Sequence, residues 1–330
     1  MRRRTIFLLC AMVALARAAE PARLLVLHKA ASTLGFYTPE GKLLAQVAVG
    51  RHPHEMALSR DGRFVYITDN GTMRIEDAGQ GGNTVSVVDV KTRKRIATIS
   101  LGKFHRPHGL DLDAQSGRLL VTTENPDRLL LIDLANRSVL RTYDTGGKTA
   151  HMVVWGPDRR YAYVSNAGSG TVAAIQLDSG EVKTIPVGQR PEGSARSPDG
   201  RWIYVVNRES HRITILDPAR NEAVGEIPTG RGPVRVAVTP DGQTLVYALI
   251  HDGAVEFADP AARRVLATVK LEGSPVSLSL SPDGERAWAA VQDRDTVYCV
   301  SVKERRILRS FRTPQGSGPD PAIELPEGVF

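Results

Sequence analysis

One recurring position in the sequence carries side chains that bind metal ions. The position follows a proline or an alanine at the start of a short apolar segment, and in four successive copies it holds His54, His108, His151 and Glu192. The next two copies carry valine there. Three imidazoles and a carboxylate are the ligands of a zinc, copper or iron site that keeps one position open. We therefore predict these four residues as metal ligands, provided that the fold brings the copies together.

A second series of positions changes character at the same point in the chain. It reads Lys29, Asp69, Glu124, Asn166, Asn207, Leu249 and Val291, which is polar in five copies and apolar in the last two. A metal near these positions would polarise a carbonyl or activate water, and a carboxylate would orient the imidazoles or act as a general base. Asp69 and Glu124 are therefore candidate catalytic residues. Candidate cofactor contacts are Asn70, Asn125, Asn166 and Asn207.

These residues also have a purely structural interpretation. A histidine after a proline can hydrogen-bond the backbone of a neighbouring segment, and Asn166 and Asn207 can fasten loops. The chain has no glycine-rich phosphate loop, serine nucleophile elbow or His-Glu-x-x-His pattern. It also lacks Cys-x-x-Cys-His, which excludes a covalent c-type haem but leaves a noncovalent haem open.

The elements that must position these residues come from an internal repeat. The turn Ser197-Pro198-Asp199-Gly200-Arg201 recurs in full or in part, and its glycine position falls at 62, 117, 159, 200, 242 and 284. Four of the five steps are 41 or 42 residues; the first is longer because residues 72–82 are inserted. A repeat of this period indicates a solenoid or a propeller.

Each repeat predicts four short strands. Segments rich in valine, isoleucine, tyrosine and threonine alternate with polar turns, which is typical of a propeller blade. Residues 24–28, 34–37 and 43–49 resemble the last three strands of a blade that lacks its first, and residues 322–325 could supply the missing inner strand, with Asp320 near the histidine position. We predict an all-β, seven-bladed β-propeller of four-stranded antiparallel blades over residues 22–326, closed by a split N- and C-terminal blade, with residues 327–330 as a tail.

The motifs identify a resemblance to a known family. Tyr163-Val164-Ser165-Asn166 and Tyr204-Val205-Val206-Asn207 resemble the signature of YVTN-repeat propellers, preceded by their usual Ser-Pro-Asp-Gly-Arg turn. The resemblance implies a seven-bladed propeller in a superfamily that includes lactonase-type hydrolases, streptogramin-lyase-like enzymes, haem d1-associated proteins and binding scaffolds. A fold of this kind does not choose the function.

The N-terminal residues predict export. Three arginines precede an apolar run that ends in Ala16-Arg17-Ala18, which is typical of a signal peptide over residues 1–18. Its four arginines account for four of the seven net positive charges, so nucleic-acid binding loses its main support. We expect a periplasmic or secreted monomer with no transmembrane segment after cleavage, whose single remaining cysteine, Cys299, forms no internal disulfide.

Three functions stay open at this point. The first is a binding module for a small ligand, a haem or an envelope protein at the loop face of the channel. The second is a metal-dependent hydrolase or lyase that uses His54, His108, His151 and Glu192. The third is a structural protein with a silent channel, so whether the chain is an enzyme stays undecided.

Overall fold

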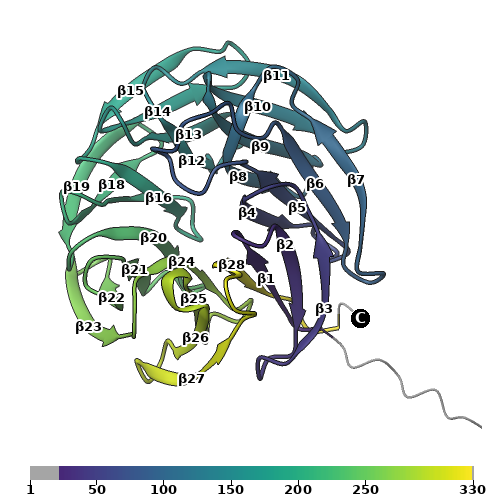
Figure 1. Ribbon diagram of the computed structural model, residues 1–330. Helices are drawn as coiled ribbons and strands as arrows, with labels where there is room; N and C mark the ends of the chain where they lie inside the picture. The colour runs from purple at the N-terminus through teal and green to yellow at the C-terminus, as the bar shows by residue number, and fades with distance from the viewer. Residues whose placement is uncertain (1–21, 329–330) are drawn as a thin grey trace, which may run out of the picture.

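The computed structural model describes residues 22–328 and shows seven β-sheets arranged around a central axis (Figure 1). Each sheet has four antiparallel strands, and the short 3-10 segment η1 (Gln292–Arg294) is the one helical element within residues 22–328. The predicted all-β, seven-bladed propeller is therefore confirmed. The predicted signal peptide lies outside the described residues.

We number the blades 1 to 7 from the sheet that contains the first strand. Blade 1 consists of β28 (Pro319–Glu324), β1 (Leu24–His28), β2 (Thr33–Tyr37) and β3 (Leu43–Ala48). Blade 2 consists of β4 (Pro53–Leu58), β5 (Phe64–Asp69), β6 (Thr84–Asp89) and β7 (Lys94–Ser100), and blade 3 of β8 (His105–Asp113), β9 (Arg118–Asn125), β10 (Asp127–Asp133) and β11 (Ser138–Asp144). Blade 4 consists of β12 (Ala150–Trp155), β13 (Tyr161–Asn166), β14 (Thr171–Gln176) and β15 (Val182–Pro186), and blade 5 of β16 (Pro191–Arg196), β17 (Ile203–Asn207), β18 (Arg212–Asp217) and β19 (Glu222–Pro228). Blade 6 consists of β20 (Pro233–Val238), β21 (Leu245–Leu249), β22 (Ala254–Asp259) and β23 (Arg264–Lys270), and blade 7 of β24 (Pro275–Leu280), β25 (Arg286–Val291), β26 (Thr296–Ser301) and β27 (Arg306–Arg312).

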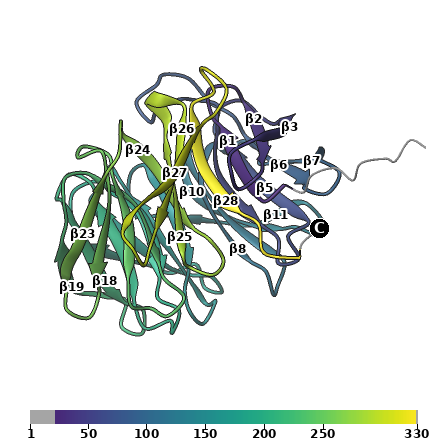
Figure 2. The ribbon, with the colours of Figure 1, turned by 90° about the horizontal axis from the view of Figure 1, so that it is seen from below.

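The two ends of the chain share blade 1. Strand β28 lies beside β1 (Figures 1 and 2). The two strands pair antiparallel, so that Leu24 lies opposite Glu324 and His28 opposite Pro319. Glu324 also accepts a hydrogen bond from the indole of Trp288 in blade 7, at 2.8 Å. The split blade is thus as predicted, and its inner strand begins three residues before residue 322. Pairing the termini hides the sheet edges that an open ring would expose.

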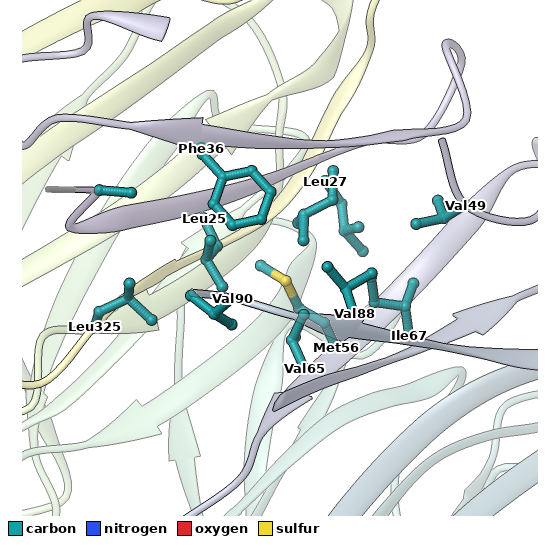
Figure 3. Close-up of a cluster of buried hydrophobic side chains, with 12 residues drawn as sticks. Leu25, Leu27, Phe36, Val49, Met56, Val65, Ile67, Val88, Val90 and Leu325 are labelled. Carbon is teal, nitrogen blue, oxygen red and sulfur yellow. The ribbon is translucent and has the colours of Figure 1, made fainter. Parts of the chain in front are cut away.

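The core lies between neighbouring blades. Between blades 1 and 2, apolar side chains from both sheets interdigitate, including Leu27, Phe36, Met56 and Ile67 (Figure 3). Leu27, Phe36 and Ile67 are fully buried. Because strand side chains alternate between the two faces, each blade contributes one apolar face to each neighbour. This packing holds the innermost strands, and therefore the candidate site, in fixed positions.

The innermost strand of most blades begins with a sharp bend. The residue before its first proline or alanine has a positive φ in six blades: His52, Arg106, Thr149, Arg190, Gly232 and Gly318. Glycine adopts this left-handed conformation freely, whereas other residues are strained in it. Two of the strained residues, Arg106 and Arg190, lie at the candidate site.

Candidate functional site

The predicted histidine position forms a ring at one end of the central channel. In all seven blades the residue after the first proline or alanine of the innermost strand lines one cavity of about 400 Å³. These residues are His54, His108, His151, Glu192, Val234, Val276 and Asp320. Asp320 follows Pro319 as His54 follows Pro53, so it is the equivalent residue of the split blade. We call this cavity the histidine cup.

A second ring of residues lines the histidine cup from the ends of the second strands and the loops that follow them. It comprises Lys29, Asn70, Glu124, Arg208, Ile250 and Gln292. The second predicted series, from Lys29 to Val291, mixed two registers. Asp69 pairs with Pro53, and the residues that pair in the same way with the inner strands of blades 1 and 3 are His28, opposite Pro319, and Thr123, opposite Pro107. Lys29 and Glu124 therefore lie one residue beyond the position of Asp69, and this extra residue brings them into the cup.

The three histidines form a stacked row across blades 2 to 4. The ring centroids of His54 and His108 are 3.8 Å apart, as are those of His108 and His151, while His54 and His151 are 6.4 Å apart. Gly109 permits this approach, since a Cβ there would lie 2.5 Å from the carbonyl oxygen of His151. Burial lowers the pKa of all three imidazoles, that of His151 to about 3, so the row is neutral at pH 7.

Threonines fix the backbone of this row and leave most of its imidazole nitrogens without partners. The hydroxyls of Thr68 and Thr122 donate to the carbonyl oxygens of His108 and His151, at 2.8 and 2.5 Å. Nδ1 of His108 lies 2.6 Å from Oε1 of Glu124. Within residues 22–328, seven buried side-chain atoms of residues that line the cup have no hydrogen-bond partner: His54 Nδ1, His108 Nε2, His151 Nδ1, Arg208 Nε, Arg235 Nε, Gln292 Nε2 and Asp320 Oδ1. The backbone contacts of the structural interpretation are therefore made by threonines, not by the imidazoles.

Carboxylates and cations alternate around the rest of the cup. The guanidiniums of Arg190 and Arg208 lie 3.1 and 3.2 Å from Oε1 of Glu192. Lys29 Nζ lies 3.5 Å from Asp320. Burial alone would raise the pKa of Glu192, but His151 and the nearby arginines outweigh it and the net shift is downward. The cup is thus strongly polar on these blades, with close to balanced charge.

An ion pair spans the channel next to the cup. Glu55 follows His54 in blade 2, Arg235 follows Val234 in blade 6, and Arg235 Nη2 lies 2.5 Å from Oε1 of Glu55. Both residues are buried. The pair therefore joins two blades on opposite sides of the channel beside the cup.

The structure also brings together a donor group that differs from the predicted metal set. Ligand atoms of His54, Glu55 and Asp320 lie within 4.8 Å of one another. Of the four predicted metal ligands this group contains His54. Arg235 and Lys29 already neutralise the two carboxylates, which makes this group less favourable for a cation than its ligand types suggest. The predicted His/His/His/Glu metal site stays a prediction.

Glu124 and Arg106 link the histidine row to the inserted residues 72–82, which we call the 72–82 loop. Burial raises the pKa of Glu124 to about 7, although Arg106 Nε lies 3.2 Å from its Oε2. The same Arg106 guanidinium donates to the carbonyls of Arg74, Ile75 and Asp77 and to the hydroxyl of Thr72. Residues 72–76 line the cup, so the 72–82 loop forms part of its wall.

The other predicted site residues lie away from the cup. Asp69 is buried and accepts hydrogen bonds from Gly50 N and from the hydroxyls of Thr84 and Ser86. Asn166 donates to the carbonyl of Thr145, and Asn207 accepts from Gly188 N, so both fasten loops as the structural alternative expected. Asn125 is exposed at the end of β9.

Asn70 does line the cup. Its amide donates to the carbonyl of Pro107, and its Oδ1 accepts from Thr72. The structure thus brings together His54, His108, His151, Glu192, Glu124 and Asn70, and it does not bring Asp69, Asn125, Asn166 or Asn207 to them.

Sequence reasoning missed several charged residues of the cup. Five of them line it, Arg74, Glu76, Arg190, Arg208 and Arg235, and two lie beside it in contact with lining residues, Arg106 and Glu55. A signal was present for three of them: Arg106 and Arg190 share the position before the repeat proline, and Arg208 shares the position of Asn70. Glu76 and Arg235 gave no such signal, because one lies in an insertion and the other differs from its counterparts.

Comparisons with known proteins agree with the architecture. A family described as "Lactonase, 7-bladed beta-propeller" matches residues 102–259. The chain is 28% identical over 168 residues to the seven-bladed beta-propeller protein Rv1057 of Mycobacterium tuberculosis (strain ATCC 25618 / H37Rv). That match covers 49% of this chain and 39% of the relative, which is about two fifths of the relative's length.

Two solved structures are similar over nearly the whole ring. A functionally unknown protein from Desulfotomaculum acetoxidans DSM 771 superposes with a TM-score of 0.77 at 13% identity, covering 92% of this chain and 99% of that one. A protein described as a putative 6-phosphogluconolactonase from Bacteroides uniformis ATCC 8492 gives a TM-score of 0.73 at 14% identity, with the same coverage. At these identities the likeness shows the fold alone. Within the described part of the chain, we find no helical segment with the length and apolar character of a membrane span.

Proposed function

We propose that this seven-bladed β-propeller, part of which is similar to the lactonase family, binds a small organic molecule in the histidine cup. The observation that carries the proposal is the set of buried imidazole nitrogens without partners, on His54, His108 and His151. A buried polar atom without a hydrogen bond costs about 1–3 kcal/mol, so three in one row favour a role in binding.

The shape and lining of the cup support an organic ligand. Its volume of about 400 Å³ lies within the usual range for small-molecule sites, about 300–1,000 Å³. Val234, Ile250 and Val276 line one arc, whereas the histidines and the charged residues line the rest. A molecule with a carbon skeleton and several hydroxyl or carbonyl groups would satisfy both arcs.

Glu124 prepares His108 for such a ligand. When Nδ1–H of His108 donates a hydrogen bond to the carboxylate of Glu124, Nε2 keeps its lone pair free to accept one. The ring of His108 lies 3.8 Å, centroid to centroid, from each of the two neighbouring imidazoles. The neutral row then accepts hydrogen bonds from ligand hydroxyls. Arg106 holds Glu124 from the other side.

Calorimetric titration tests the proposal. We expect sugar acids, their lactones or a haem to bind the purified chain with one site per molecule, and a His108→Ala variant to weaken binding at least tenfold. His251→Ala is the matched control, because His251 is an exposed imidazole that does not line the cup. Binding that His108→Ala leaves unchanged would refute the proposal.

Metal-dependent hydrolysis is a second candidate function, and the contact between His108 and Glu124 favours it. An imidazole whose one nitrogen is held by a carboxylate and whose other nitrogen is unpartnered has the arrangement of a metal-ligating histidine. His108, with His54 and His151 beside it, would hold the ion, which would polarise the carbonyl of an ester or lactone. Glu124 would keep His108 in the ligating tautomer.

Elemental analysis separates the two functions. The chain should be purified without chelator or added metal, next to a His54→Ala/His108→Ala/His151→Ala variant with retained fold. About one equivalent of a transition metal that the variant loses would favour the hydrolase. Metal absent from both proteins, with ligand binding by the unsubstituted chain, would favour the binding module.

The location of the protein is part of the same proposal. Residues 1–18 have the character of an export signal, so we expect the mature chain in the periplasm or medium. Cell fractionation and N-terminal sequencing of the mature protein would test this. A chain that retains residue 1 in the cytoplasmic fraction would contradict it.

A further inference from the structure

Glu76 reaches the histidine cup from the 72–82 loop and meets a cluster of arginines. Its Oε1 accepts a hydrogen bond from Nη2 of Arg190 at 3.0 Å. The pKa of the Glu76 carboxyl is lowered, mostly by a hydrogen bond to its own backbone and in addition by Arg190 and Arg208. An anionic group of the protein itself therefore lies where the cup gathers positive charge.

The arginines at this place outnumber the buried acid that they share. Nε of Arg190 and Nη1 of Arg208 both point to the same oxygen, Oε1 of Glu192, and Arg235 lies 4.0 Å from its other oxygen. Arg235 is already paired with Glu55. One buried carboxylate thus serves two guanidiniums. Nε of Arg208 makes no hydrogen bond, and its nearest other acid is the partly exposed Glu209, whose Oε1 lies 3.5 Å away.

The contact between Glu76 and Arg190 is easily displaced. The Glu76 side chain is 63% exposed, and a salt bridge between groups of this exposure stabilises a protein only weakly. The base of the 72–82 loop is held separately, since Arg106 donates to four acceptors within it. Glu76 can therefore leave Arg190 without unfolding the loop.

We infer that Glu76 occupies the place of an oxyanion of the ligand, and that the cup takes a molecule carrying a carboxylate or a phosphate. This inference rests on the proposed function. The oxyanion displaces Glu76 and binds Arg190 and Arg208, whose planar guanidiniums suit carboxylate and phosphate geometry. The carbon skeleton then lies over Val234 and Ile250 of the next blade, and the remaining polar groups face the histidine row.

The arrangement also makes the cup favour anions over neutral molecules such as lactones. An anion replaces the carboxylate of Glu76 on Arg190, whereas an uncharged ligand has to bind beside it. The 72–82 loop, present in blade 2 and in no other repeat, thereby contributes specificity as well as a wall.

Binding of simple oxyanions tests the inference directly. Gluconate and inorganic phosphate should be titrated at constant ionic strength into the full chain and into Glu76→Gln, Arg190→Gln and Arg208→Gln variants. Removing the competing carboxylate should tighten oxyanion binding by up to about fivefold, or about 1 kcal/mol. Removing either arginine should weaken it at least tenfold. The stronger of the two probes identifies carboxylate or phosphate as the preferred group.

Arg212→Gln is the matched control. Arg212 pairs with Glu226 on the exposed part of blade 5, so this variant changes the net charge as Arg190→Gln and Arg208→Gln do but leaves the cup intact. It should bind both probes like the unsubstituted chain.

Two results would overturn the inference. The first is a Glu76→Gln variant that binds both oxyanions no better than the unsubstituted chain. The second is a loss of binding in Arg212→Gln as large as in Arg190→Gln.

Failure of the proposed function looks different. If uncharged gluconolactone binds and His108→Ala abolishes its binding while Glu76→Gln has no effect on any probe, the cup is a ligand site and the oxyanion inference alone is wrong. If His108→Ala changes the binding of no molecule, the proposed function is wrong as well.

Discussion

Replacing Arg235 with methionine should destabilise the whole propeller, because the ion pair between Arg235 and Glu55 joins blades 2 and 6 across the channel. The two charged groups are 2.5 Å apart, and both side chains are close to 10% exposed. Burial alone would raise the pKa of Glu55, but Arg235 and His54 lower it overall, so the carboxylate is ionised at pH 7. The methionine variant would leave that charge buried without its main partner.

The expected size of the effect follows from the burial of the pair. Removing one partner of a buried ion pair destabilises a protein by about 3–5 kcal/mol, whereas replacing both partners with neutral groups is often close to neutral. We therefore expect Arg235→Met to lower the free energy of unfolding by about 3–5 kcal/mol. The double variant Glu55→Gln/Arg235→Met should lower it by clearly less than the sum of the effects of Glu55→Gln and Arg235→Met. The difference between the sum and the double variant, about 1–3 kcal/mol, measures the coupling.

Urea unfolding at pH 7 measures these changes, with tryptophan fluorescence and circular dichroism as two probes of the same transition. Arg212→Gln removes an exposed pair instead and should change the free energy of unfolding by less than about 1 kcal/mol. The reasoning fails if Arg235→Met changes stability by less than about 1 kcal/mol, or if the two single effects add without coupling.

Three further predictions concern stability. Burial lowers the pKa of His28 from 6.5 to about 4, so the folded state resists protonation of this imidazole and up to about 3 kcal/mol of stability is lost as the pH falls through that range. In the His28→Gln variant, the urea midpoint of unfolding should depend less on pH between 6.5 and 4. An unchanged pH dependence of the midpoint would contradict this. Burial raises the pKa of Asp69 from 3.8 to about 6, so the fold loses stability as the pH rises through this range and the ionised carboxylate destabilises it above pH 6. Asp69→Asn, which restores the residue type of Asn166 and Asn207, should therefore stabilise the protein by about 1–3 kcal/mol at pH 7 and show no advantage below pH 3.8. A variant less stable at pH 7 would refute the argument. Removing residues 319–330 deletes β28 and exposes the edge of β1. We expect aggregation in size-exclusion chromatography or the loss of a cooperative transition in thermal melts. A monomer with an unchanged melting temperature would show that ring closure is dispensable.

The repeat made the blades predictable, and it carried part of the site with it. Position in a repeat is equivalent to position in space in a propeller, so His54, His108, His151 and Glu192 converge as their shared position indicated. The predicted second series lost this equivalence because it mixed two registers of the repeat. In blades 1 and 3 the strand pairing differs from the predicted one by a residue. Lys29 and Glu124 therefore lie one position beyond Asp69 and line the cup, whereas Asp69 does not.

Contacts across the channel could not be predicted from the repeat. Glu55 and Arg235 are 180 residues apart and have no counterparts of opposite charge in the other blades. Glu76 and Arg190 meet because an insertion in blade 2 reaches blade 5, and nothing in the local pattern of residues 72–82 indicates which blade it contacts.

The sequence by itself determined the number of blades, the closure of the ring and the face that carries the polar residues, because these depend on strand periodicity, turn chemistry and repeat length. Tertiary structure alone decided which polar residues face one another. That choice depends on the distances between loops on different blades, and on which charges pair once water is excluded. For this reason the histidine row was predictable, whereas the arginines around Glu76 and Glu192 and the unpartnered imidazole nitrogens were not.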